Sequence, residues 1–82
     1  RVPFELGMTQ LLKGDNQAAF DQLSRAIDLY SGYAYAYYYR ALAADKIGKK
    51  DITVNDLDRF LALAPDAPDA PKAERILQAA RG

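Results

Sequence analysis

Paired aspartates are the residues whose types and spacing come closest to catalysis or metal binding. Asp56 and Asp58 stand two positions apart, and Asp66 and Asp69 follow near the end of the chain. Glycoside hydrolysis needs two carboxylates facing each other, and a calcium loop needs ligands at alternating positions around a glycine. On a helix, Asp56 and Asp58 point about 200° apart and cannot share one ion. We therefore expect both on the solvent face, paired with neighbours such as Arg59.

The composition excludes most other chemistry. The 82 residues include no His and no Cys, so an imidazole base, a thiolate nucleophile and the usual zinc ligands are all missing. We expect no enzyme, no cofactor and no metal. The 11 basic and 11 acidic side chains cancel, whereas nucleic-acid binding needs a basic excess. No apolar run reaches the length of about 18 residues that a membrane span requires.

These counts also limit what can be said of the surroundings. We expect neither nucleic-acid binding nor membrane insertion. The compartment is left undetermined, with the cytoplasm slightly favoured. Because the first residue is Arg1 rather than Met, we expect a fragment or a processed chain.

Apolar spacing predicts helices along the whole chain and no strand. Apolar residues that recur every three or four positions lie on one face of a helix. From position 19 on, this face contains Ala19, Phe20, Leu23, Ala26, Ile27 and Tyr30. The same offsets recur 34 positions later at Thr53, Val54, Leu57, Phe60, Leu61 and Ala64. Helical stretches at 4–13 and 34–47 precede these two faces. They end at Gly14 and Gly48, and glycine tolerates the left-handed backbone of a helix end.

The chain ends in a further predicted helix behind a proline-rich segment. Residues 64–71 read Ala-Pro-Asp at a period of three, and prolines disfavour helix before them, so this segment should be extended and exposed. After it, the spacing predicts a helix over about 69–80. Asp69 is its expected cap, and Pro71 is acceptable only in its first turn.

A period of 34 residues with two helices and a tight turn is typical of tetratricopeptide arrays. The second period contains Tyr37, Arg40-Ala41, Ala44, Thr53, Leu57 and Pro65, and the first contains Pro3, Leu6-Gly7, Gln10, Ala19, Leu23 and Ser31. In this order of residue types the chain resembles the tetratricopeptide repeat (TPR) family. The resemblance implies an all-α, right-handed superhelical array forming one domain over 1–82. Its parts would be repeat one at about 1–32, repeat two at about 34–66 and a capping helix at about 69–80.

Departures from the family motif mark positions of interest. Thr53 and Phe60 occupy positions where the family has small residues, which let two helix backbones approach closely. Arg40 lies in mid-helix, where its stem should pack while its guanidinium reaches an acid of the following helix.

All six tyrosines lie between Tyr30 and Tyr39. Helical geometry places Tyr30 and Tyr37 in the core. In TPR arrays the first helices of successive repeats line the concave surface, so the resemblance implies a groove there. Its expected lining residues are Phe4, Met8, Leu11, Tyr35, Tyr38 and Leu42. The capping helix or a second copy of the chain could cover the same face, which leaves burial, a partner peptide and a small ligand as alternatives.

The function that follows is a protein-interaction scaffold. We expect its groove to bind an apolar or aromatic segment of a partner whose identity the sequence does not give. The alternative is an architectural segment of a longer repeat protein, or a homo-oligomerisation module without a peptide ligand. Some TPR proteins grip a peptide's terminal carboxylate through Lys and Asn, but Phe4 and Met8 occupy the corresponding positions here. A chaperone-tail ligand is therefore not expected.

Overall fold

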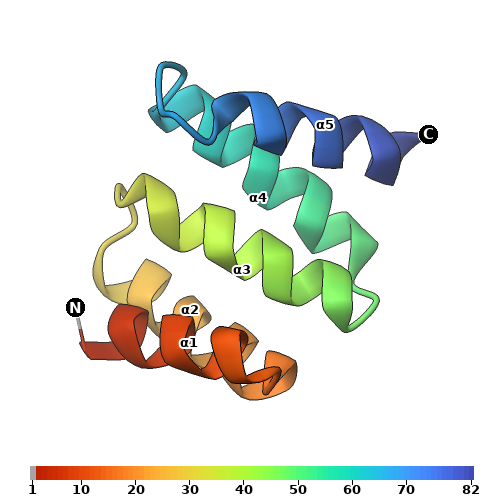
Figure 1. Ribbon diagram of the computed structural model, residues 1–82. Coiled ribbons are helices and arrows are strands. Elements are labelled where there is room, and N and C mark those ends of the chain that lie inside the picture. The colour runs from red at the N-terminus through yellow and green to blue at the C-terminus, as the bar shows by residue number, and fades with distance from the viewer. Residues whose placement is uncertain (1) are drawn as a thin grey trace.

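The computed structural model describes residues 2–82, and this part of the chain contains five α-helices and no strand. The helices are α1 (Val2–Lys13), α2 (Asn16–Leu29), α3 (Ala34–Lys46), α4 (Lys50–Leu63) and α5 (Ala70–Arg81). They stack in chain order, with α1 and α2 at one end and α5 at the other (Figure 1). The all-α prediction is confirmed, and the helix ends agree with expectation to within a few residues.

Two glycines end α1 and α3 for the predicted reason. Gly14 has a φ of 86° and Gly48 a φ of 80°. Residues that have a Cβ rarely adopt this backbone conformation. After each glycine, the next amide N–H donates back to a carbonyl of the preceding helix at 2.9 Å. These matching bonds close both helices and reverse the chain, so that α2 and α4 run back along their partners.

Each helix packs against the next one along the chain, and α1 and α3 touch only slightly. Small residues bring α1 and α2 close together, because Gly7 is buried and both Ala19 and Ala26 are fully covered. A Cβ added at Gly7 would lie 2.7 Å from Cγ of Leu23. The first helix pair is therefore so close that a methyl group at this position would require Leu23 to shift.

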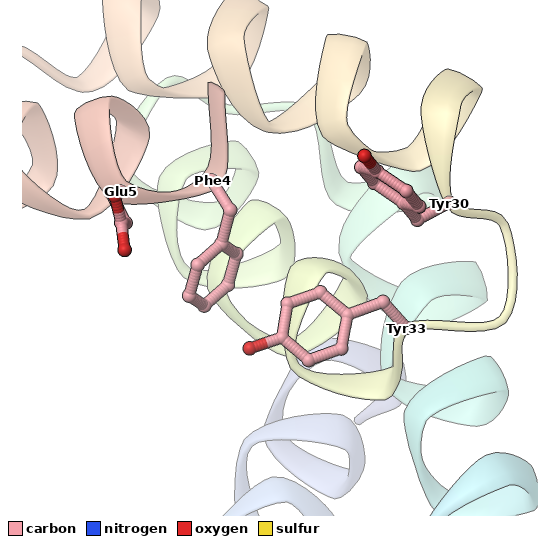
Figure 2. A pocket seen from close by; sticks show the side chains of 4 residues that line it. All are labelled: Phe4, Glu5, Tyr30 and Tyr33. Atoms are coloured by element: carbon pink, nitrogen blue, oxygen red, sulfur yellow. The ribbon is translucent and has the colours of Figure 1, made fainter. Parts of the chain in front are cut away.

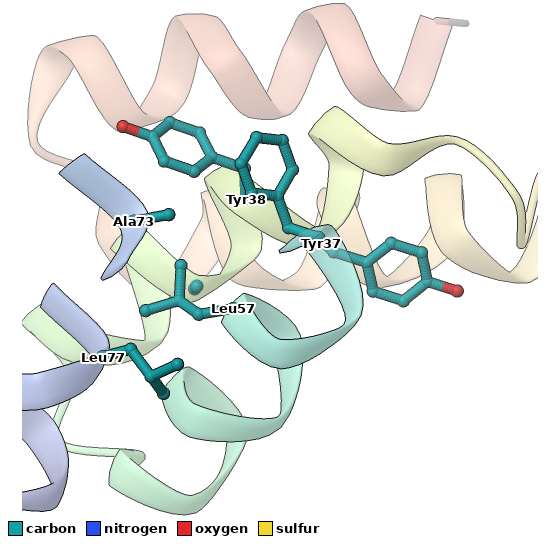
Figure 3. Packing of buried hydrophobic residues seen from close by; sticks show 7 residues of the cluster. Tyr37, Tyr38, Leu57, Ala73 and Leu77 are labelled. Carbon is teal, nitrogen blue, oxygen red and sulfur yellow. The ribbon is translucent and has the colours of Figure 1, made fainter. Parts of the chain in front are cut away.

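The second helix pair has an aromatic core. Phe60 and Leu57 of α4 are fully buried, and Tyr37 and Tyr38 of α3 are 8% and 2% exposed. The two tyrosine rings extend to opposite sides of α3 (Figure 3). Both tyrosines belong to one cluster with Ala73 and Leu77 of α5, and the Tyr37 hydroxyl donates to the carbonyl of Ser31 at 2.6 Å. Helix α5 thus completes the core that α3 and α4 begin.

The Ala-Pro-Asp segment is not extended as predicted but forms two successive turns. The amide of Ala67 donates to the carbonyl of Ala64 at 3.1 Å, and that of Ala70 donates to Ala67 at 2.9 Å. Proline stands second in each turn, where its fixed φ is favourable. The period of three therefore encodes turns that lead α4 into α5, and Pro71 lies at the start of α5 as predicted.

Tyr30 corrects a second prediction. It was expected to close the core face of α2, but its side chain is 53% exposed. Its backbone N–H donates to the carbonyl of Ala26 at the end of α2, where the helix stops. Because the chain leaves the helical path at this residue, extrapolating the helix face one turn too far placed the ring on the wrong side.

Candidate functional site

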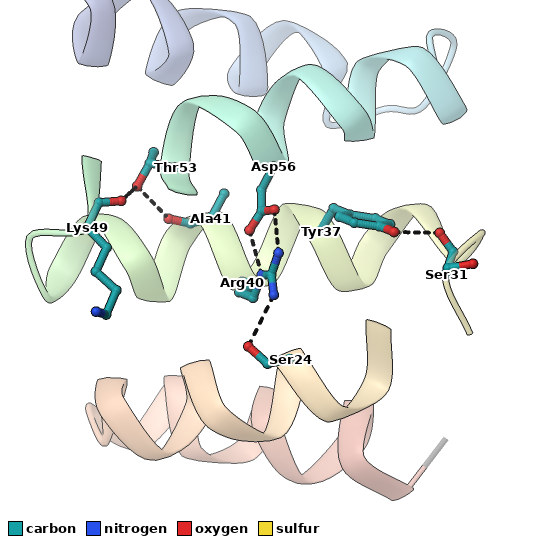
Figure 4. A network of polar contacts seen from close by, with 8 residues as sticks. All are labelled: Ser24, Ser31, Tyr37, Arg40, Ala41, Lys49, Thr53 and Asp56. Carbon is teal, nitrogen blue, oxygen red and sulfur yellow. Dashed lines mark hydrogen bonds and ion pairs between the residues drawn. The ribbon is translucent and has the colours of Figure 1, made fainter. Parts of the chain in front are cut away.

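Arg40 and Asp56 form a buried pair that links three helices. The Arg40 Nε and Nη2 atoms donate to the two carboxylate oxygens of Asp56, each at 2.8 Å, and Nη1 donates to the Ser24 hydroxyl at 3.2 Å (Figure 4). The Arg40 side chain is 21% exposed and that of Asp56 only 4%. The hydrogen bond to Asp56 raises the pKa of the Arg40 guanidinium further above its ordinary value.

This pair confirms one prediction and corrects another. Arg40 reaches an acid of the following helix, as expected. Asp56 was expected on the solvent face beside Asp58, but it lies inside the structure because Arg40 neutralises its charge. Asp58 does face outward and forms an exposed ion pair with Arg81 at 2.8 Å. The two carboxylates point apart as predicted, and their pairing with cations is structural in character.

Leu11 and Leu42 line one hollow with Ile76 of α5, and Phe4 and Tyr35 both contact the ring of Tyr39. We call the surface formed by α1, α3 and α5 at these residues the α1–α3–α5 surface. Five of the six predicted groove residues are partly buried, namely Phe4, Met8, Leu11, Tyr35 and Leu42. Tyr38 differs, because its 2% exposure places it in the core beneath α5. The expectation that Tyr38 lines an open groove is therefore wrong in this structure, and the alternative of cover by the last helix describes this residue.

Aromatic rings connect this surface to the core. Phe4 lies 4.8 Å from Tyr33 and 6.0 Å from Tyr39, measured between ring centroids. The ring centroid of Tyr39 lies 5.0 Å from that of Tyr38, and the centroid of Tyr38 lies 4.9 Å from that of Phe60. Tyr39 is not among the predicted groove residues, although it lies one turn after Tyr35. Edge-on and tilted ring pairs are favoured arrangements, so this chain of rings adds packing between α1, α3 and α4.

One hollow on the surface brings together α1, α3 and α5. We call it the basic hollow; it measures about 590 Å³, and its lining includes Leu11, Leu42, Ile76, Lys13, Lys46 and Lys72. Of these, only Leu11 and Leu42 were predicted. Ile76 could have been found, because it follows Leu42 by the same 34 positions that separate Leu42 from Met8.

A second hollow lies at the beginning of α1 and α3. We call it the aromatic hollow; it measures about 530 Å³ and is lined by Phe4, Glu5, Tyr30 and Tyr33 (Figure 2). Only Phe4 was predicted to face a ligand. The helical projection predicts Tyr30 in the core, and Tyr33 is not among the predicted groove residues. Their aromatic character within a loop rich in small residues was the available signal.

Three tyrosines of α3, namely Tyr35, Tyr38 and Tyr39, are less acidic than free tyrosine. Burial raises the pKa of Tyr35, Tyr38 and Tyr39 above the ordinary value, and the negative charge of Asp69 raises each of them further. A neutral hydroxyl is therefore favoured at all three positions in the folded state. These groups stay protonated at neutral pH and present donors and ring faces, not charges.

Comparisons with protein-family models, curated proteins and solved structures gave no match. Within residues 2–82, no group of three or more acidic side chains is placed to hold a metal ion. No helix in the described part of the chain is long and apolar enough to cross a membrane.

Proposed function

We propose that the chain is a TPR-like module of two repeats and a capping helix, and that its α1–α3–α5 surface binds an apolar or aromatic segment of a partner protein. The repeat assignment is supported by residues 34 positions apart that share a structural role. Gly14 and Gly48 both have positive φ. Leu23 and Leu57 are both fully buried. Helix α5 packs against α4 as α3 packs against α2.

The polar outer side of α5 fits the capping role. Arg75 and Gln78 are exposed, whereas Ala41 and Ala44, 34 positions earlier, are fully buried against the next helix. Terminal repeats need a polar outer face to remain soluble. A further helix would have to pack against these two polar side chains, so α5 is suited to end the array.

The binding function is carried by one observation. The lining of the basic hollow, of about 590 Å³, includes aliphatic side chains from α1, α3 and α5, namely Leu11, Leu42 and Ile76. Partly exposed aliphatic side chains gathered in a concavity are the usual floor of a peptide-binding groove. Partly buried Met8 on α1 and Tyr35 on α3 add apolar area to this surface.

Peptide selection from a random displayed library on the whole chain tests this proposal. Selected peptides should bind saturably in fluorescence anisotropy. Changing Met8 and Leu11 together to Ser should weaken binding about tenfold, because aliphatic burial is lost. Leu29→Ser is the matched control, since Leu29 is 59% exposed on α2 and lines neither hollow. Equal effects of the two changes, at unchanged helical circular dichroism, would contradict the proposal.

A second candidate function is favoured by exposed apolar residues at the other end of the stack. Val2 is 73% and Leu6 42% exposed on α1. Arg40, which follows Leu6 by 34 positions, contacts Ser24 of the preceding helix pair. The corresponding side of α1 is uncovered, which fits a preceding repeat or a second copy of the chain. Light scattering over a concentration series tests self-association, and a monomer at every concentration would exclude it.

A further inference from the structure

Lysines from three helices line the basic hollow together with its aliphatic floor. Lys13 ends α1, Lys46 ends α3, and Lys72 lies in the first turn of α5. One acidic residue, Asp45, lines the same hollow, so three positive charges stand against one negative charge. The basic and acidic side chains of the whole chain cancel. The hollow is therefore a local concentration of positive charge on a molecule that is neutral as a whole.

These lysines have no partner for their charge within the described part of the chain. Among residues 2–82, no carboxylate lies within ion-pair distance of the three ammonium groups. In contrast, Arg40 and Arg81 each meet an aspartate at 2.8 Å. Like charges gathered around a concavity raise its local potential and attract an ion of the opposite sign. The hollow is therefore suited to receive an anionic group from outside the molecule.

Lys72 is the member of this group that its own helix does not explain. Lys13 and Lys46 stand in the last turns of α1 and α3, where the negative end of the helix dipole favours a cation. Lys72 stands in the first turn of α5, where the dipole end is positive and no acidic residue accompanies it. Asp69 precedes this turn but forms no ion pair with Lys72. An anion bound in the hollow would offset this unfavourable placement.

We infer that the basic hollow binds an acidic side chain, glutamate or aspartate, of the partner segment, while the apolar neighbours of that residue cover the aliphatic floor. The lining matches both parts of such a ligand, because Leu11, Leu42 and Ile76 offer apolar area and the lysines meet the carboxylate. The inference rests on the proposed function, since it specifies the partner chemistry of the same surface. The lysines stand on all three helices that the segment crosses, which places the carboxylate within the segment and not at its end.

The test compares two capped peptides, N-acetyl-Leu-Glu-Leu amide and its neutral isostere N-acetyl-Leu-Gln-Leu amide. Both are titrated into the whole chain at low ionic strength, and the methyl resonances of Leu11, Leu42 and Ile76 are followed by NMR. The glutamate peptide should shift them saturably at millimolar concentration, and the glutamine peptide should bind at least about fivefold more weakly. Equal affinity of the two peptides, or no saturable shift with the glutamate peptide, would overturn the inference.

Two further measurements examine the origin of this preference. Raising the salt concentration to about 0.5 M should remove most of it, because ions screen exposed charges. N-acetyl-Leu-Gln-Leu with a free terminal carboxylate has the same charge as the glutamate peptide at a different place, and it should bind more weakly. Equal affinity of these two peptides would overturn the assignment to a side chain within the segment.

Substitutions of opposite charge effect assign the preference to the lining of the hollow. Lys72→Gln should reduce the preference for glutamate at least about twofold, and Asp45→Asn should increase it. Lys50→Gln is the matched control, because this exposed lysine gives the same change in net charge and does not line the basic hollow. If Lys72→Gln lowers helical circular dichroism, Lys46→Gln serves instead. Equal effects of the folded variant and the control would overturn the inference.

Failure of this inference can be told apart from failure of the proposed function. The combined Met8 and Leu11 serine variant should weaken the glutamate and glutamine peptides alike, because it removes apolar area and no charge. Equal affinity of the two peptides, with both weakened in the serine variant, defeats this inference alone. A preference for glutamate that Lys72→Gln reduces and the serine variant leaves unchanged, at unchanged affinity, defeats the proposed apolar groove alone.

Discussion

The first helix pair, α1 and α2, and the second, α3 and α4, follow one backbone plan with different interiors. At equivalent positions the first pair has Gly7, Ala19, Leu23 and Ala26, and the second has Ala41, Thr53, Leu57 and Phe60. All of these residues are buried. The first interior closes by bringing two backbones together, and the second is filled by rings that α5 covers. A helix pair can thus tolerate bulk at a small-residue position when a further helix encloses it.

The pairs also differ in charge. Arg40 and Asp56 form the bidentate pair of the second, whereas Leu6 and Gln22 occupy the equivalent positions of the first. The polar link therefore belongs to one helix pair only, and it reaches back to Ser24 in the other. Four changes can break or sharpen this comparison, and their expected effects decrease in the order given.

Removing the ring of Phe60 should have the largest effect. Phe60→Ala leaves a cavity beside Tyr35 and Tyr38, whose ring centroids lie 5.1 Å and 4.9 Å from that of Phe60. We expect a loss of about 4 kcal/mol in the free energy of unfolding, measured by urea titration. Leu63→Ala, at a position 40% exposed on the same helix, should cost less than about 1 kcal/mol. Similar losses would show that Phe60 does not fill the second interior.

Breaking the buried ion pair should come next. Asp56→Ala leaves the Arg40 guanidinium without its carboxylate, and we expect a loss of about 2–3 kcal/mol because Arg40 keeps some contact with solvent. Gln22→Ala makes the equivalent change in the first pair and should cost less than about 0.5 kcal/mol. Chemical denaturation of both variants measures the difference. Equal losses would contradict the view that charge distinguishes the pairs.

Adding one methyl group to the first pair should have a moderate effect. Gly7→Ala gains about 1 kcal/mol in helix propensity, but its Cβ would lie 2.7 Å from Leu23 Cγ and 3.4 Å from the Ala19 carbonyl oxygen. Overpacking of this kind costs roughly 1–3 kcal/mol, so we expect a net loss of about 1 kcal/mol in thermal unfolding. A more stable variant would show that the helices can separate without cost.

Alkaline pH should destabilise the second pair through three tyrosines of α3. Burial raises the pKa of Tyr35, Tyr38 and Tyr39 in the folded state. The folded chain then holds its protons more tightly than the unfolded chain. The stability that these hydroxyls contribute is therefore complete below the unfolded tyrosine pKa of about 10 and is lost as the pH rises through the folded values.

Absorbance at the tyrosinate band and circular dichroism would follow this transition together. Tyr38→Phe should reduce the loss of stability at alkaline pH, because one raised group is removed. Tyr30→Phe is the control, since Tyr30 is exposed at the end of α2. An equal reduction in both variants would show that the loss of stability at alkaline pH does not come from the buried tyrosines of α3.

The helices were predictable because their signals are local. Apolar spacing and the two glycines fix the helix faces and ends without reference to distant residues. The same holds for Arg40, whose position in mid-helix required a partner for its charge. Tyr30 was misplaced because it stands where the helix stops, and a helical projection gives no direction to a residue beyond that point.

The candidate site was only partly predictable because it depends on how distant helices meet. Tyr38 lies on the expected face of α3, but α5 covers it, and sequence spacing does not fix the angle at which α5 returns. Asp56 is buried for a related reason, since its environment is decided by Arg40, 16 residues away. The two hollows are lined by residues from separate helices. Lys72 and Tyr33 line them only because the helices pack in this way.

The reach of Arg40 has a consequence for how the molecule loses its structure. Its guanidinium contacts the ring of Phe20 and the hydroxyl of Ser24 in one helix pair and the carboxylate of Asp56 in the other. If the pairs separate, Arg40 keeps Asp56 of its own pair but loses the Phe20 ring and the Ser24 hydroxyl, so opening one pair has a cost for the other. Repeat arrays unfold cooperatively when the interface between neighbours is strong. Amides of α2 and α4 should therefore exchange with similar protection, as one cooperative unit.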